Sequence, residues 1–179
     1  FADDCADLGT AEWSDWVDPV GPKVEKTIYF LEDSCHELEY YCEDALGNET
    51  VHEFEIDIVD TQGPVIEKTV VGPQYGDCPP RPGTDDECFV DGVTEIHVDA
   101  VDPEPHPVNE VVCDWEYTIL DGPTGSWGNT GLTPPFVITF AEESTHELTI
   151  TCRDALGNET VDVEVFIVDH TPPVITKKY

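Results

Sequence analysis

The ten residues CEDALGNETV at positions 42–51 return as CRDALGNETV at 152–161, with nine of the ten positions identical. The similarity extends upstream, where FLEDSCHEL at 30–38 aligns with FAEESTHEL at 140–148. A repeat of this length and fidelity indicates two related structural modules and not a chance match. The chain is therefore expected to use one type of module twice.

Each copy of the repeat predicts two strands joined by a tight turn. Apolar and polar residues alternate with a period of two, which is typical of strands with one buried face. Gly47-Asn48 and Gly157-Asn158 suit the turns, because Gly and Asn tolerate positive φ. No stretch combines helical spacing with capping residues, so the predicted fold class is all-β. The side chains expected to face the core are Leu38, Tyr40, Cys42, Phe54, Ile56 and Ile58 in the first copy, and Leu148, Ile150, Cys152, Val163, Val165 and Ile167 in the second.

The order strand, DALGNET turn, strand and V-D-x-x-x-P-V-I segment resembles the last hairpin and linker of Ig-like repeats. Such repeats occur in bacterial and archaeal surface proteins and in the related hyalin (HYR) modules. The resemblance covers 29–68 and 136–179 best and is weaker over 90–125. It implies tandem extracellular Ig-like β-sandwiches, which serve as spacers, adhesins or filament subunits.

The Val-Asp pair of each linker marks a predicted domain boundary. It divides the chain into an incomplete Ig-like domain at 1–60, a complete one at 61–169 and an additional C-terminal strand at 170–179. The complete domain opens with GPVIEKTVV at 63–71. Nothing within 1–60 matches that opening strand, whereas HTPPVITKKY at 170–179 does.

A sandwich that lacks an edge strand exposes apolar side chains and unpaired backbone groups. A strand from a neighbouring copy would cover both, which is donor-strand complementation. Such a head-to-tail contact does not close on itself and so builds a filament. The expected donor residues are Val174, Ile175, Lys177 and Tyr179, with the aromatic N-terminal segment as an alternative donor. Two other interpretations remain open: a window from a longer tandem array, and a first module that is shorter but self-sufficient.

The charge of the chain limits its partners. The 40 acidic residues against 7 basic ones give a formal net charge of −33, which would repel nucleic acid and anionic membrane surfaces. No apolar run approaches the roughly 20 residues needed to cross a bilayer. The expected partners are copies of the same chain, without nucleic acid or membrane insertion, and glycans remain an alternative. The expected location is extracellular, in a cell-surface appendage.

Seven cysteines and no methionine indicate an oxidising compartment. Cys78 and Cys88 flank the short loop CPPRPGTDDEC and are expected to pair locally. The Ig-like resemblance implies an inter-sheet Cys113–Cys152 disulfide, packed by the nearby Trp115.

The cysteines of the first module leave two possibilities. Cys42 is the counterpart of Cys152, so a Cys5–Cys42 disulfide is expected, with Cys35 unpaired or bonded to another molecule. The alternative is a Cys5–Cys35 disulfide with Cys42 buried and free.

Acidic residues on loops offer the oxygen ligands that calcium prefers. The candidates are Asp60 and Asp169 at the domain joints, the group Asp99, Asp102 and Glu104, and Asp44 and Asp154 before the two turns. The alternative is a solvated acidic surface, in which Asp44 and Asp154 bond to their own turns. Asn48 and Asn158 lie in N-glycosylation sequons, although the turns themselves require the same residues.

Catalysis is not expected. His36 and His146 occupy equivalent positions, which favours a structural role, and His97 near Asp99 and Asp102 has no nucleophile motif beside it. No catalytic residue and no cofactor is predicted, with calcium as the one alternative. The predicted function is a structural subunit of a head-to-tail filament. The alternatives are a calcium-stiffened adhesin repeat and an accessory carbohydrate-binding module of a secreted enzyme.

Overall fold

The structure is a computed structural model that describes residues 12–14, 26–81, 87–103, 110–122 and 124–178. Within these residues every regular element is a β-strand, as the all-β prediction requires. The strands are β1 (Ser34–Tyr40), β2 (Glu53–Val59), β3 (Val65–Val71), β4 (Gln74–Gly76), β5 (Cys88–Val90), β6 (Glu95–Val101), β7 (Val112–Ile119), β8 (Ser126–Leu132), β9 (Phe136–Ile138), β10 (Thr145–Arg153) and β11 (Glu159–Val168). None of the described segments is a helix of the length and apolarity needed to cross a membrane.

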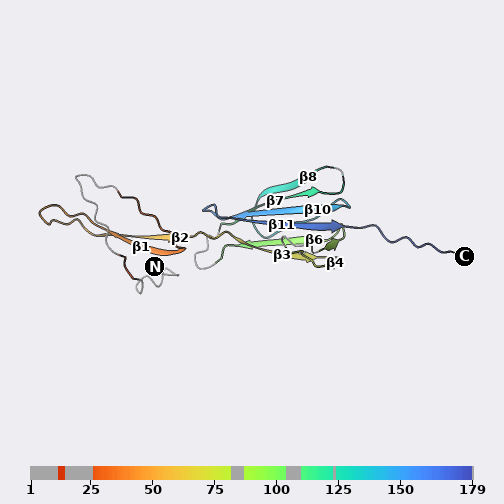
Figure 1. Ribbon diagram of the computed structural model, residues 1–179, viewed down its shortest axis with the longest axis horizontal. Coiled ribbons are helices and arrows are strands. Elements are labelled where there is room, and N and C mark those ends of the chain that lie inside the picture. The colour runs from red at the N-terminus through yellow and green to blue at the C-terminus, as the bar shows by residue number, and fades with distance from the viewer. Residues whose placement is uncertain (1–11, 15–25, 82–86, 104–109, 123, 179) are drawn as a thin grey trace. The chain divides into compact units, whose positions relative to one another are not determined.

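The described residues fall into two compact units. Those up to Gln62, together with Pro103, belong to the first unit, and the others belong to the second. The first unit contains the antiparallel hairpin of β1 and β2 (Figure 1). In this hairpin His36 lies opposite Asp57, and Leu38 lies opposite Glu55. Of its described residues only Ser34, Cys35 and His36 are buried.

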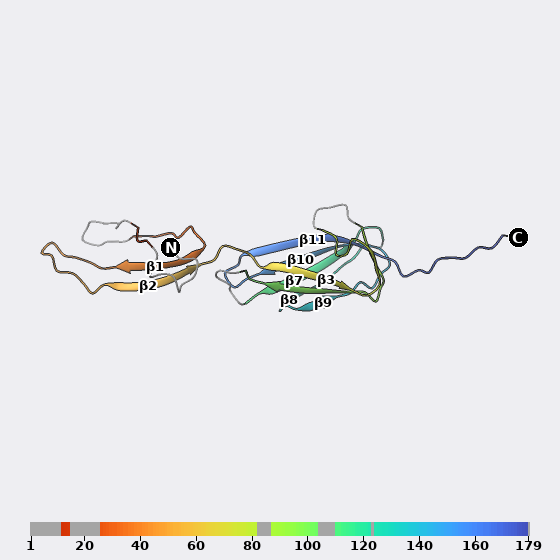
Figure 2. The same ribbon diagram turned by 90° about the horizontal axis from the view of Figure 1, so that it is seen from below.

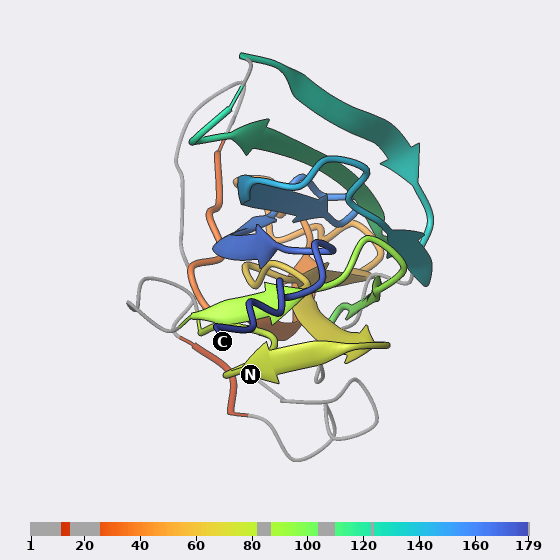
Figure 3. The same cartoon turned by 90° about the vertical axis from the view of Figure 1, so that its right-hand side faces the viewer.

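The second unit consists of two sheets. One has six strands in the order β4-β5-β11-β10-β7-β8, and the other has three in the order β3-β6-β9. β5 runs parallel to β11, and every other pair is antiparallel. Figure 3 looks along this unit and shows β7, β10 and β11 in one layer and β3 and β6 in the other.

A single apolar core fills the space between these two sheets. Its buried residues are Val70, Cys88, Val90, Ile96, Val98, Ala100, Val111, Cys113, Tyr117, Ile138, Phe140, Leu148, Ile150, Cys152, Phe166 and Val168. His146 lies within it, with ring centroids 5.0 Å from Tyr117 and 4.8 Å from Phe140. Its Nδ1 is 3.1 Å from the carbonyl oxygen of Ser144, which gives this histidine a structural role.

Two disulfides stabilise the second unit, Cys78–Cys88 and Cys113–Cys152. The second of them differs from its predicted geometry. Cys113 on β7 lies directly opposite Cys152 on β10, so the bond links adjacent strands of one sheet and not the two sheets. Side chains directly opposite each other in an antiparallel pair share a face and lie close together, which permits such a bond. The two disulfides indicate a non-reducing compartment.

The facing of β11 differs from the prediction. In an antiparallel pair, residues directly opposite each other point to the same side of the sheet. Leu148 is buried and lies opposite Glu164, so Glu164, Phe166 and Val168 face the core. Val163 and Val165 lie on the outer face, where they are 40% and 37% exposed. Apolar alternation therefore misassigned the faces, because β11 has apolar residues on both.

In the first hairpin, too, the side chains of the second strand face differently from the prediction. Leu38 lies opposite Glu55, whereas Ile56 lies opposite Glu37. Phe54, Ile56 and Ile58 are therefore on the face opposite to Leu38 and Tyr40, and they do not form one apolar face with them. All three are more than half exposed in the structure, at 55%, 58% and 57%.

Candidate functional site

A polar cluster lies inside the second unit, where an apolar core would be expected. Lys68 on β3 reaches across the sandwich and forms ion pairs with Asp162 and Glu164 on β11. The three side chains are only 5%, 14% and 1% exposed, respectively. Charges this deeply buried are costly unless they are paired, so the position of Lys68 relative to β11 is specified by electrostatics as well as by packing.

The strands explain how these charges meet. On β3, Val70 is buried and Ile66 and Lys68 are half-buried, while the residues between them are exposed. The same period of two places Asp162 and Glu164 on the inner face of β11. Burial raises the pKa of Glu164 to about 7, and the negative charge of Asp162 adds to this, while the hydrogen bond and charge of Lys68 oppose it.

The first unit has two acidic residues at the positions that correspond to Asp162 and Glu164 in the second unit. Tyr40 lies opposite Glu53, as Ile150 lies opposite Asp162. Leu38 lies opposite Glu55, as Leu148 lies opposite Glu164. The two hairpins therefore share one register, and Glu53 and Glu55 occupy the positions of Asp162 and Glu164.

These two glutamates have no basic partner in the described part of the first unit. Both are exposed, and Glu55 accepts a hydrogen bond of 3.0 Å from the Tyr40 hydroxyl. Lys26 is the one Lys or Arg residue within 26–62, against eleven acidic residues. The counterpart of Lys68 must therefore come from outside these residues if the cluster is to be completed.

The segment 170–178 follows β11 and is extended, with none of the described strands paired to it (Figures 1 and 2). His170 and Thr171 contact Glu143, at 3.2 Å and 2.9 Å. Beyond them, Val174 and Ile175 are 85% and 93% exposed.

The predicted calcium ligands are spread over both units. Asp60 follows β2 and Asp169 follows β11, and each accepts a hydrogen bond from the backbone two residues later, Gln62 at 2.9 Å and Thr171 at 3.0 Å. Asp99 lies on β6 and bonds the amide of Ala100. Asp102 lies just after β6, and Glu104 falls outside the described residues. The equivalent turns explain one carboxylate oxygen of Asp60 and one of Asp169, and calcium at these residues stays a prediction.

Asp44 and Asp154 hold the two Gly-Asn turns. Oδ1 of Asp154 accepts three backbone hydrogen bonds of 2.7–2.9 Å, from Leu156, Gly157 and Asn158, and Oδ2 accepts one from the Asn158 side chain. Asp44 likewise accepts hydrogen bonds from the backbone and the side chain of Asn48. Gly47 and Gly157 have φ of 84° and 92°, which favours glycine there.

The two sequon asparagines therefore hold their turns through the same amides that a glycan would modify. Asp102 and Asp154 also have carboxylate oxygens within 4.8 Å of each other. Because both oxygens of Asp154 already accept hydrogen bonds from the turn, turn formation explains its position.

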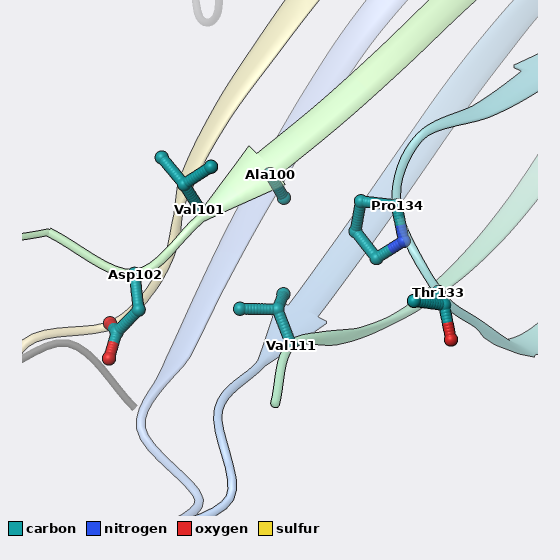
Figure 4. A pocket seen from close by; sticks show the side chains of 6 residues that line it. All are labelled: Ala100, Val101, Asp102, Val111, Thr133 and Pro134. Carbon is teal, nitrogen blue, oxygen red and sulfur yellow. The ribbon is translucent and has the colours of Figure 1, made fainter. Parts of the chain in front are cut away.

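A small pocket of about 150 Å³ lies in the second unit (Figure 4). It is lined by Ala100, Val101, Asp102, Val111, Thr133 and Pro134. Figure 4 shows Asp102 and Thr133 on opposite sides of it, so their polar atoms do not converge on one point. His97 is exposed on β6, 2.8 Å from Glu95. Neither feature assembles a nucleophile and a base.

The expected Cys5–Cys42 disulfide is contradicted by the structure. Cys42 is a free, exposed thiol. Cys35 is fully buried and takes part in a disulfide whose partner lies outside the described residues. Cys5 is the one cysteine of the sequence that lies there. Cys42 lies beyond the end of β1, and in the described part of the first unit no strand corresponds to β7, which supplies the partner of Cys152. The prediction failed because it transferred the role of Cys152 to a residue without that neighbour.

Sequence reasoning missed Lys68 and Glu164. Alternation predicts that Glu164 faces solvent, and it gives no role to Lys68. The signal that could have drawn attention to Lys68 is the pattern shared by PVIEK at 64–68 and PVITK at 173–177. Comparisons with protein-family models, with curated proteins and with solved structures gave no match. Function must therefore be argued from this geometry alone.

Proposed function

We propose that this protein is an extracellular structural subunit that assembles head-to-tail into a filament. In this assembly the segment 170–178 of one copy completes the first unit of the next, and both units are Ig-like sandwiches. One observation carries the proposal. The two hairpins have the same register, and in the second unit Lys68 of β3 reaches from the opposite sheet to the acidic pair on the inner face of the hairpin.

The segment 170–178 repeats the pattern of β3. PVITK at 173–177 aligns with PVIEK at 64–68, so Ile175 corresponds to Ile66 and Lys177 to Lys68. A second copy of the β3 pattern, extended and exposed, has the composition to cover a second hairpin of the same kind.

Charge also supports this contact. The segment 170–178 has two lysines and no acidic residue, whereas residues 26–62 have a large acidic excess. Two copies with a net charge of −33 each repel one another overall, so a basic segment docking on an acidic unit is one of the few attractive contacts available. In the second unit β3 lies in the other sheet and pairs its backbone with β6. By this analogy the inward side chains of 170–178 would supply both the contact with the hairpin and its register.

A second candidate function is a spacer in a longer tandem array, in which 170–178 opens a further module of the same chain. The equivalent turns after β2 and after β11 favour it, since the first of them leads directly into β3. Both candidates use the same strand, and they differ in whether it is supplied by another molecule.

The experiment compares the 179-residue chain with a variant lacking 170–179. Light scattering and negative-stain microscopy are expected to show fibres for the complete chain and none for the variant. A synthetic peptide of residues 170–179, added in excess, should cap the first unit and block growth. A complete chain that stays monomeric at high concentration, and ignores the peptide, would overturn the proposal.

A further inference from the structure

The acidic pair in the first unit and a basic residue in segment 170–178 fit each other as parts of one site. We propose that Lys177 is the register-setting residue of the assembly, and that its ammonium group pairs with Glu53 and Glu55 of a second copy. This inference rests on the proposed function. The group that the acidic pair of one copy would bind is a lysine at a fixed position in an apolar, extended strand of another copy.

The spacing within the strand supports this assignment. In β3 the lysine follows the proline Pro64 by four residues, and Lys177 follows Pro173 by four. Along β3 the inward side chains alternate, so Ile66 and Lys68 share a face. A strand of the same pattern that turns Ile175 toward the hairpin must also turn Lys177 toward it, while Lys178 points to the opposite side.

The receiving site has the matching geometry. Glu53 and Glu55 are two residues apart on β2 and share the face of Leu38 and Tyr40. Asp162 and Glu164 have the same spacing and the same face on β11, and there they hold Lys68. The protein thus contains one complete example of the site, and its acidic pair and its lysine pattern each occur a second time, at 53–55 and at 173–177.

Pairing of Lys177 with Glu53 and Glu55 would favour one register of the strand over registers shifted by one or two residues. A slip of one residue would turn Lys177 to the other side and bring Thr176 or Lys178 inward. A slip of two residues would place a lysine against an apolar position and leave both carboxylates covered without a counter-ion, which is strongly unfavourable. Apolar contacts alone tolerate such slips, so the lysine supplies specificity that they cannot.

The test uses peptides of residues 170–179 as inhibitors of fibre growth by the complete chain. The wild-type peptide is compared with Lys177→Glu and with the matched control Lys178→Glu, which makes the same change of charge on the outward side. We expect Lys177→Glu to need at least about tenfold more peptide for half-inhibition, and Lys178→Glu less than about threefold more. Direct binding of the same peptides to a Glu55→Lys chain that lacks 170–179 should reverse the order, so that the Lys177→Glu peptide binds more tightly than the wild-type peptide does.

The outcomes separate the two levels of the proposal. If no peptide inhibits growth, or no fibres form, the assembly itself is refuted. If the wild-type peptide inhibits growth and the two variants are equally weakened, the assembly stands and the role of Lys177 is refuted. Circular dichroism of the Glu55→Lys chain checks that it is folded, and the peptide comparison on the unmodified chain does not depend on that variant.

Discussion

Lys68 and Glu164 lie on opposite sheets of the second unit and form an ion pair within its core. The pair ties the first strand of that unit to its last. Its position between the sheets means that neither charge can return to water without opening the sandwich.

Replacing Lys68 by Met should destabilise the second unit by about 3–5 kcal/mol near pH 8, because two carboxylates would stay buried without a counter-ion. The loss is expected to shrink below pH 6, where Glu164, whose pKa is raised to about 7, takes up a proton. Urea unfolding followed by tryptophan fluorescence measures both values. Glu67→Gln, on the exposed side of the same strand, is the matched control and should change stability by less than about 0.5 kcal/mol. A Lys68→Met variant as stable as the control would show that the pair contributes nothing.

The stability of the second unit should fall as the pH rises through about 7. Burial raises the pKa of Glu164 to about 7 from an ordinary value of 4.5, so between these values the folded state binds the proton that the unfolded state releases. The contribution is complete below the unfolded pKa and is lost above the folded one, with a size of roughly 1–3 kcal/mol. Unfolding free energies at pH 5, 6, 7 and 8 measure it.

Glu164→Gln is the variant that isolates this effect. Glutamine keeps the size of the side chain and does not titrate, so the fall in stability between pH 5 and pH 8 should become smaller. Because Lys68 retains Asp162 as a partner, the variant should still fold. An unchanged pH profile in Glu164→Gln would assign the dependence to other groups.

Replacing Asp154 by Ala should destabilise the β10–β11 turn by about 1–3 kcal/mol, because three backbone N–H groups lose their acceptor. Burial alone would raise the pKa of Asp154, but the hydrogen bonds from Asn158, Gly157 and Leu156 outweigh it and lower the pKa. The stabilisation is thus present above the unfolded pKa and is lost as the pH falls through the folded one. Asp154→Asn retains an acceptor oxygen and should lose less, and equal losses in the two variants would argue against the turn. Thermal unfolding at pH 7 and pH 3 measures the difference.

Cys42 should be the cysteine that alkylating reagents label in the folded, oxidised protein. It is exposed and free, whereas Cys35, Cys78, Cys88, Cys113 and Cys152 are in disulfides. Peptide mass mapping after treatment with iodoacetamide locates the label, and Cys42→Ser should remove it. Labelling at Cys35 with protection of Cys42 would restore the pairing that the repeat suggested.

The repeat was sufficient to predict an all-β protein with Gly-Asn turns, because alternation and turn chemistry are local properties. The sequence also predicted the local Cys78–Cys88 disulfide, since the nine residues between them include several Pro and Gly residues that favour a turn. The hydrogen bonds of Asp44 and Asp154 show that both residues hold their turns, and calcium at these residues stays a prediction.

The facing of the second strand of each hairpin was not predictable in the same way. Val163 and Phe166 are both apolar and lie on opposite faces, so hydropathy gives no preference between them. The choice depends on which residue of β10 lies opposite, and that is a matter of register between strands. For the same reason the sequence did not predict that Glu164, an acidic residue, lies on the buried face.

The amino-acid sequence by itself determined the repeat, the strand class, the acidic character and the second copy of the β3 pattern at 173–177. Tertiary structure alone decided which carboxylates face inward, which cysteine stays free and which strands the Cys113–Cys152 bond links. Those outcomes depend on pairing between segments that are far apart in the chain. This pairing determines which residues surround a buried charge or a thiol, and the surrounding residues set the energy of burying the charge or of forming the disulfide.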